Sequence, residues 1–207
     1  MIAALFVHPG GVYYNLPNIE PWNEDDDARL YDGPWPIIAH PPCQRWGRYW
    51  SGGPSASYRR KLGDDNGCFK AALAAVRKFG GVIEHPEASK AWEHFGLLKP
   101  PKKGGWVSAG DGGWTCCVEQ GHYGHKARKA TWLYVNGVHP MLLPEIKWGH
   151  SGKKMRMDAG CRSTEEYRRL SKQGILSRLS RLSRLERIAT PTPFRNLLIE
   201  IVSEVRK

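Results

Sequence analysis

The fold of this chain is decided by residues 68–84, which read CFKAALAAVRKFGGVIE. Apolar side chains recur there at helical spacing, and the pattern predicts an amphipathic helix over Cys68 to Phe79. Two glycines follow, as is typical of a helix end, and the run from Val82 to Glu84 predicts a strand. The apolar residues on the shared helix face are Phe69, Leu73, Val76 and Phe79.

Two short apolar runs precede this unit, and both predict buried strands. Ile2–Val7 ends in a glycine-rich turn, and Pro36–Ala39 is stopped by Pro41 and Pro42. The order strand, helix, strand predicts a βαβ unit with right-handed crossovers. We therefore expect an α/β fold with a mostly parallel sheet and flanking helices.

The remaining elements are shorter. Acidic residues after Asn23 favour a short helix that runs to Leu30. Glycines and prolines predict a loop over 99–113. We also expect a short helix over 88–95, strands over 116–119 and 131–135, a basic aromatic loop over 121–129, and a final helix over 194–205.

The C-terminal part is polar and basic. Ser163 and Glu166 match a capping box for a helix over 164–172. Residues 176–185 repeat Leu-Ser-Arg every three residues, which indicates either a solvated helix or linker, or an element that contacts phosphates. We expect an α/β domain over 1–150 that carries the site, and a basic helical segment over 151–207 that packs on the same domain.

Length and composition restrict the class of protein. A chain of 207 residues with 41% apolar content can bury one core, so one compact domain is expected. The sequence contains neither a membrane-helix pattern nor a secretion-signal pattern, so we expect no membrane partner and a cytoplasmic location. The five cysteines are expected to be reduced thiols.

The charge balance points to a polyanionic partner. A net charge of +11 and nine tryptophans favour nucleic acid, with basic and aromatic residues interleaved. The alternative is a basic protein whose charge serves solubility alone.

Cys43 is the candidate nucleophile. Two prolines precede it just beyond a predicted buried strand, where the carboxyl end of a parallel sheet opens to ligands. A lone cysteine is otherwise often inert and buried.

Four segments resemble motifs of the cytosine-5 DNA methyltransferases, in the order of that family. They are Leu5–Gly11, Pro41-Pro42-Cys43-Gln44, Ile83-Glu84-His85-Pro86 and Tyr123–Arg128. The resemblance implies a minimal methyltransferase-like, Rossmann-like sheet and a small, phage-type enzyme that modifies DNA in a bacterial host. It also implies S-adenosylmethionine as cofactor.

Site residues follow from the same resemblance. The catalytic residues it implies are Cys43, Glu84 and Arg128. Those it implies for the cofactor are Phe6, Gly10, Gly11, Pro41 and Glu20, with Glu24 or Asp25 as alternatives to Glu20. The expected nucleic-acid contacts are Gln44, Arg45, Trp46, Arg48, Tyr123, His125 and Lys126.

This chemistry makes demands on the two central groups. Carbon 5 of cytosine becomes nucleophilic once a thiolate adds to carbon 6, while an acid hydrogen-bonds ring nitrogen N3. We therefore expect a lowered thiol pKa at Cys43 and a raised carboxyl pKa at Glu84. The nearest cations are expected to be Arg45, Arg48 and Arg128.

Several alternatives stay open. Trp46 and Trp50 fit core packing as well as base contacts. The cluster of Cys116, Cys117, His122 and His125 could hold zinc, although its spacing is unusual and we expect no metal. The region between Phe6 and Cys43 is short for the family. The chain could therefore use another donor at a pyrimidine, or bind nucleic acid without catalysis.

Overall fold

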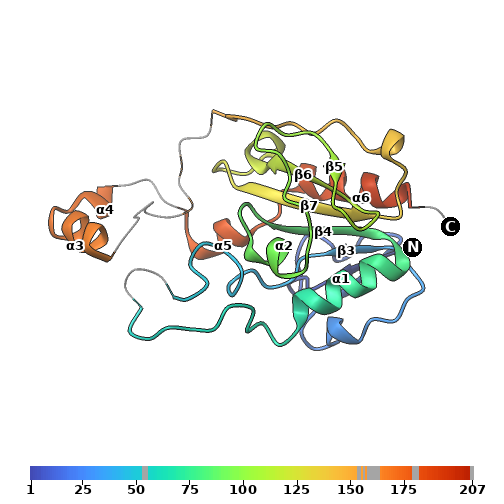
Figure 1. Ribbon diagram of the computed structural model, residues 1–207, viewed down its shortest axis with the longest axis horizontal. Coiled ribbons are helices and arrows are strands. Elements are labelled where there is room, and N and C mark those ends of the chain that lie inside the picture. The colour runs from blue at the N-terminus through green and yellow to red at the C-terminus, as the bar shows by residue number, and fades with distance from the viewer. Residues whose placement is uncertain (53–55, 153–154, 156, 158–163, 179–181, 206–207) are drawn as a thin grey trace.

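The computed structural model describes residues 1–52, 56–152, 155, 157, 164–178 and 182–205. Their core is a seven-stranded mixed sheet between helices (Figure 1). Helix α1 (Cys68–Phe79) covers one face of the sheet, and helix α6 (Thr192–Ser203) covers the other. The predicted α/β class is confirmed.

The sheet has a parallel half and an antiparallel half. Its strands, in spatial order, are β2 (Ile19–Trp22), β1 (Ile2–Leu5), β3 (Ile37–Ala39), β4 (Gly81–Pro86), β7 (Ala130–Asn136), β6 (Trp114–Glu119) and β5 (Val107–Ser108). Strands β2, β1, β3 and β4 pair in parallel, whereas β7, β6 and β5 each pair antiparallel with the strand before them. The predicted βαβ unit is therefore β3–α1–β4.

Alternating side chains of each strand separate two cores. On β1, Ala3 and Leu5 face the core that contains α1, while Ile2 and Ala4 face the core that contains α6. The strands read as continuous apolar runs because both faces are covered. Burial of both faces also fixes the register, since a shift by one residue would exchange the two sets.

Most predicted elements are confirmed, and α1 has the predicted bounds. The other helices are η1 (Ala28–Leu30), α2 (Lys90–His94), η2 (Gln120–Tyr123), η3 (Pro140–Leu142), α3 (Thr164–Lys172), α4 (Ile175–Arg178) and α5 (Arg184–Ile188). Acidic residues 23–27 form turns, and only the last turn of the predicted helix over 23–30 is present, as η1.

Two strands and one cap were not predicted. Edge strands β2 and β5 are short and partly exposed, so neither gives an apolar run. The expected cap residue Ser163 lies outside the described residues, as do 179–181 of the Leu-Ser-Arg repeat. A capping box is present instead at Ser183 and Glu186, which start α5. In Figure 1, α3 and α4 lie to one side of the sheet, whereas α6 packs on it.

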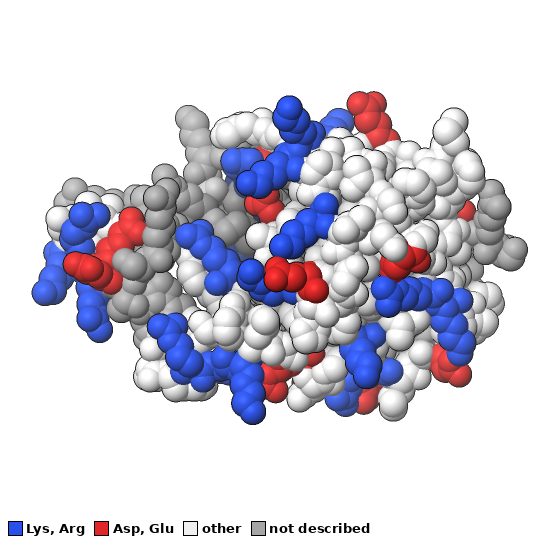
Figure 2. Space-filling view, viewed as in Figure 1, with Lys and Arg blue, Asp and Glu red and all other residues white. Residues whose placement is uncertain are grey.

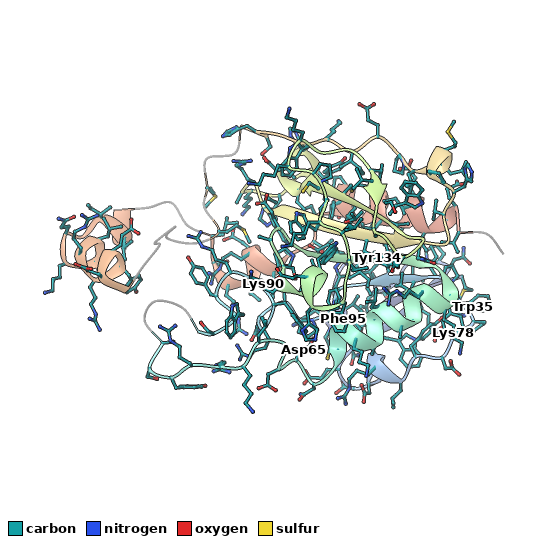
Figure 3. The ribbon with its side chains drawn as sticks, in the orientation of Figure 1. Trp35, Asp65, Lys78, Lys90, Phe95 and Tyr134 are labelled. Atoms are coloured by element: carbon teal, nitrogen blue, oxygen red, sulfur yellow. The ribbon has the colours of Figure 1, made fainter. Side chains whose placement is uncertain are left out.

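Asp65 starts α1 and ties it to the loop before it. Its carboxylate accepts hydrogen bonds from the backbone N–H groups of Gly67 (3.0 Å), which immediately precedes α1, and of Phe69 (2.9 Å) in the first turn. It also accepts the indole N–H of Trp46 at 2.7 Å. Figure 3 labels Asp65 at the start of the helix, near Phe95.

Strand β4 approaches β3 closely at Gly81. Gly81 has φ 136°, and a Cβ there would lie 2.0 Å from the carbonyl oxygen of Ile37. Gly67 also has a positive φ of 77°, but a Cβ there would meet no atom within 4 Å.

We expect Gly81→Ala to lower the free energy of unfolding by about 3 kcal/mol or more, and Gly67→Ala by about 1–2 kcal/mol. Urea denaturation measures both, and equal losses would contradict the close approach.

Candidate functional site

The candidate site lies where the chain direction across the sheet reverses. From β1 the chain moves to β2 on one side, and from β3 it moves to β4 on the other. Ligands bind outside the carboxyl ends of strands at such a point. The segments that follow β1 and β3, and the end of β4, carry His8, Cys43 and Glu84. The predicted position of Cys43 beyond a buried parallel strand is confirmed.

A tight turn presents Cys43. The residue is exposed, and its carbonyl oxygen accepts hydrogen bonds from the N–H groups of Trp46 (3.0 Å) and Gly47 (2.9 Å). Trp46 itself is 2% exposed, and its carbonyl accepts the N–H of Lys90 at 2.9 Å. The prediction that Trp46 contacts nucleic acid is wrong, because its ring lies in the core. Through its hydrogen bond to Asp65, Trp46 anchors the Cys43 turn instead.

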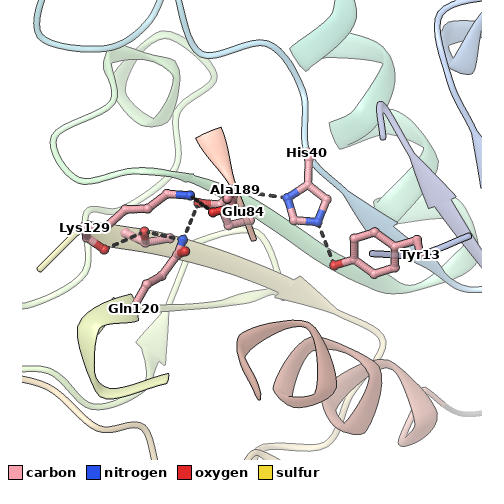
Figure 4. A network of polar contacts seen from close by, with 7 residues as sticks. Tyr13, His40, Glu84, Gln120, Lys129 and Ala189 are labelled. Carbon is pink, nitrogen blue, oxygen red and sulfur yellow. Dashed lines mark hydrogen bonds and ion pairs between the residues drawn. The ribbon is translucent and has the colours of Figure 1, made fainter. Parts of the chain in front are cut away.

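Both carboxylate oxygens of Glu84 are held by side chains. The Oε2 atom lies 3.1 Å from Nδ1 of His40, and Oε1 accepts a hydrogen bond of 3.1 Å from Nε2 of Gln120 (Figure 4). Gln120 also donates to the hydroxyl of Thr131 at 3.0 Å. The Glu84 side chain is 13% exposed, so it is a nearly buried carboxylate fixed from two directions.

Lys129 supplies the positive charge in this cluster. Its ammonium donates to the carbonyl of Ala189 at 2.8 Å, and Figure 4 shows it beside the carboxylate of Glu84. Its charge lowers the pKa of both Glu84 and Cys43. Arg128 instead pairs with the buried Glu119 at 2.8 Å. Lys129 therefore replaces the predicted Arg128 as the cation of the site.

The two central pKa values are opposite to those expected from the sequence. Although the residue as a whole is exposed, loss of hydration around its sulfur is the larger cause that raises the pKa of the Cys43 thiol, and the negative charge of Glu84 adds to it. Burial opposes ionisation of Glu84, but the hydrogen bond from His40 and the charge of Lys129 outweigh it, so its pKa falls to about 2. At neutral pH the free site therefore holds a protonated thiol at Cys43 and an ionised carboxylate at Glu84.

His85 is buried near the prolines that precede Cys43, and its ring is neutral at physiological pH. Burial lowers its pKa to about 4, and its Nδ1 atom lies 2.7 Å from the hydroxyl of Ser89. The backbone groups of Pro41 and Pro42 partly oppose this fall, because they raise the pKa of His85. Its Nε2 atom is buried and has no hydrogen-bond partner among the residues that the structure describes.

The loop between β6 and β7 is held by the protein itself, contrary to part of the prediction. His125 is 3% exposed, and its ring nitrogens lie 3.0 Å and 3.1 Å from the carbonyls of Ala127 and Glu186. It is therefore not a nucleic-acid contact. Tyr123 packs against Phe194, and its hydroxyl accepts the N–H of Lys147 at 3.0 Å.

Three predicted contacts remain at the surface. Gln44 and Arg48 are exposed near the Cys43 turn. Lys126 is exposed and pairs with Glu186 at 2.5 Å.

The predicted cofactor residues are only partly brought together. Phe6 directly follows β1 with φ 59°, and Gly10 and Gly11 form the turn beyond it, where a Cβ on Gly10 would meet nothing within 4 Å. Pro41 is buried, two residues beyond the end of β3. Glu20 lies within β2, and its carboxylate accepts the indole N–H of Trp22 at 2.9 Å.

A basic hollow lies next to the Cys43 turn, in the connection from β3 to α1. Its volume is about 510 Å3, and it is lined by Arg45, Tyr58, Arg59, Arg60, Lys61, Asp64 and Asn66. The guanidinium of Arg60 lies 4.7 Å from the centre of the Tyr58 ring. Figure 2 shows Lys and Arg side chains at the lower left of this face, where that connection runs in Figure 1.

The alternative zinc cluster is not assembled. Cys116 and Cys117 are both buried and face opposite sides of β6. The described part of the chain contains no group of three or more His, Cys, Asp or Glu residues that could hold a metal ion. In the same part of the chain, each helix is too short or too polar to cross a membrane.

Comparison with known proteins identifies no relative. No family model, no curated protein and no solved structure matches the chain.

Sequence reasoning missed four residues of the cluster: Tyr13, His40, Gln120 and Lys129. His40 directly precedes the two prolines, so its place at the end of β3 was a usable signal. Tyr13 and Lys129 come from loops and Gln120 from the start of η2, and their approach to Glu84 depends on tertiary structure.

The charge of Glu84 is expected to restrain Cys43. Glu84→Gln removes that negative charge, so the pKa of the Cys43 thiol should fall and the thiolate fraction at pH 8 should rise. We expect Cys43 to react with iodoacetamide about threefold to tenfold faster in this variant. Peptide mass spectrometry measures the rate, with Cys68 as internal reference and Glu87→Gln as the matched control. An unchanged rate at Cys43 would show that the two groups are not coupled.

Proposed function

We propose that this protein modifies a pyrimidine base in DNA, with cytosine C5 methylation as the reaction. The observation that carries the proposal is the pairing of an exposed cysteine with a nearly buried glutamate at the carboxyl edge of parallel strands. Ala39 and Ile83 are paired neighbours on β3 and β4, so the segments that carry Cys43 and Glu84 leave the sheet side by side. We interpret the sheet as methyltransferase-like and Rossmann-like because the strand order reverses between β1 and β3.

The protonation states of Cys43 and Glu84 suit the formation of a covalent adduct. In the free protein one proton resides on the Cys43 thiol and none on Glu84. As the sulfur bonds to carbon 6, its proton passes to Glu84 and from there to ring nitrogen N3. The nucleophile becomes a thiolate only as the acid becomes neutral, so the adduct forms without an external proton.

Carbon 5 then acts as the nucleophile. It bonds to the transferred carbon of the donor, and the bond between that carbon and its carrier breaks. A water molecule takes the proton from carbon 5 and carries it to solvent, the electron pair re-forms the double bond between carbons 5 and 6, and the sulfur leaves as a thiolate. The proton on N3 then returns through Glu84 to the sulfur. Lys129 stabilises the negative charge of the thiolate and of the carboxylate during these steps.

S-adenosylmethionine would supply an electrophilic methyl group when bound. The turn at Gly10 and Gly11 beyond β1 suits a ligand at the reversal point, because Gly10 leaves open space. Glu20 does not suit the binding of a ribose, because it lies inside β2 and its carboxylate is occupied by Trp22.

A second candidate keeps the adduct and changes the donor. The connection of residues 6–18 between the parallel strands β1 and β2 contains no helix, whereas such crossovers usually carry one. This connection favours a donor smaller than a nucleoside. Calorimetry with S-adenosylmethionine distinguishes the two, since the second candidate predicts no binding heat.

DNA is the proposed partner. The basic hollow starts at Arg45, two residues after Cys43, and combines four cationic side chains with Tyr58. Such a surface attracts a phosphate backbone and offers a ring for stacking. A base that leaves the duplex to reach Cys43 needs contacts of this kind for its neighbours.

A duplex that contains 5-fluorocytosine tests the adduct. Fluorine cannot leave carbon 5 as a cation, so we expect a complex that survives denaturation, with S-adenosylmethionine present. Cys43→Ser should abolish the complex, and Cys68→Ser should leave it intact. Gel electrophoresis and mass spectrometry of the cross-linked peptide detect it. A protein that binds DNA without catalysis gives no complex, and a complex that forms equally without S-adenosylmethionine removes that donor from the reaction.

The basic hollow has its own test. We expect the double variant Arg59→Ala, Arg60→Ala to bind duplex DNA about tenfold more weakly and to reduce the salt dependence by up to about two phosphate contacts. Lys102→Ala, Lys103→Ala is the matched control, because both lysines are exposed on another loop and the charge change is equal. Fluorescence anisotropy at several salt concentrations measures both. Equal losses in the two variants would indicate a general charge effect and no specific site.

A further inference from the structure

His40 lies between two buried groups at the reversal point of the sheet. Its backbone N–H donates to the carbonyl of Leu5 at 3.1 Å, which fixes its position at the end of β3. Its side chain is 13% exposed. One ring nitrogen lies 2.8 Å from the hydroxyl of Tyr13, and the other lies 3.1 Å from Glu84 (Figure 4).

Tyr13 determines which nitrogen of His40 carries the proton. Tyr13 is 2% exposed, and burial raises the pKa of its hydroxyl well above the usual range, so the group keeps its proton. A buried O–H group needs an acceptor, and Nε2 of His40 is the partner that the described residues provide. Nε2 therefore lacks a hydrogen in the neutral ring, and Nδ1 carries one.

This tautomer directs a donor at Glu84. The Nδ1–H group points to Oε2, while the amide of Gln120 occupies Oε1. The opposite tautomer would present a lone pair to the carboxylate and would repel it. The two consecutive hydrogen bonds, from Tyr13 to His40 and from His40 to Glu84, thus fix the orientation of Glu84 from the side opposite to Gln120.

We propose that His40 is a positioning residue of this site, held in one tautomer by Tyr13 and orienting the carboxylate of Glu84 toward the pyrimidine ring. The proposal rests on the proposed function for its catalytic consequence. His40 does not touch the reacting atoms and transfers no proton to the ring. Its effect is to keep the carboxylate oriented and ionised until the thiol proton arrives.

The pH dependence of adduct formation separates this role from a purely structural one. The reactive pair holds one proton, so the rate falls at acid pH when Glu84 also becomes protonated. In the wild type this occurs near the pKa of about 2, and the rate should be flat from pH 5.5 to 8. Without the bond from His40, Lys129 and the nearby ring of His85 are left to oppose the effect of burial, so the pKa of Glu84 rises and the rate at pH 5.5 falls relative to that at pH 8.

Two substitutions form a matched pair. His40→Ala removes the donor, and we expect the rate of adduct formation with 5-fluorocytosine DNA at pH 5.5, relative to pH 8, to fall by about twofold or more compared with the wild type. His40→Asn retains an N–H donor near the position of Nδ1, so its profile should stay close to flat. Added imidazole should restore part of the His40→Ala rate at pH 5.5. The exposed His139 gives the control variant His139→Ala, whose profile should match the wild type.

An independent measurement needs no catalysis. Nitrogen-15 NMR of histidine-labelled protein should show the ring of His40 protonated at Nδ1, with its signals assigned from the His40→Asn spectrum. Tyr13→Phe should reduce the population of this tautomer, because Nε2 loses its donor. Protonation at Nε2 in the neutral ring of the wild type would overturn the inference.

The outcomes distinguish the two proposals. A wild type that traps DNA normally, together with a flat profile for His40→Ala, overturns the role of His40 alone. If the wild type forms no adduct at any pH, the proposed function is overturned, and with it the proposed effect of His40 on the rate of adduct formation. The NMR result then still decides whether Tyr13 holds the ring in one tautomer.

Discussion

The pairing of β3 between β1 and β4 is the constraint on which the rest of the structure depends. It places three chain segments at one edge of the sheet in a fixed order. The turn after β1, the cysteine turn after β3 and the carboxylate at the end of β4 thereby become neighbours. The close approach of Gly81 to Ile37 shows how little space this pairing leaves. Side chains that are far apart in sequence can therefore form one polar cluster.

Much of the fold was predictable because the decisive segments are buried on both faces. Such strands are nearly all apolar, and α1 has one apolar face with glycines after it, so local sequence and tertiary structure agree there. The edge strands β2 and β5 were not predictable in the same way. Each is short and partly exposed, and each depends on its neighbour for its conformation.

The candidate site was predictable in its two central residues, but not in the residues that surround them or in its electrostatics. Cys43 and Glu84 stand on their predicted segments, since both directly follow or end a recognisable strand. Their pKa shifts depend on His40 and Lys129, which approach Glu84 from separate parts of the chain. The direction of each pKa shift depends on the distances between these groups, and the sequence alone does not give those distances. Trp46 shows the same limit, because its core environment is set by Asp65, which lies 19 residues later.

The retained proton on Cys43 has a consequence for the lifetime of the protein in a cell. Peroxides oxidise thiolates far faster than thiols, and the first product is a sulfenic acid that can progress to irreversible acids. A sulfur that is exposed and permanently ionised would be consumed in this way. Loss of hydration around the sulfur, and to a lesser extent the negative charge of Glu84, keep it protonated and so give an accessible cysteine the chemical durability of a buried one.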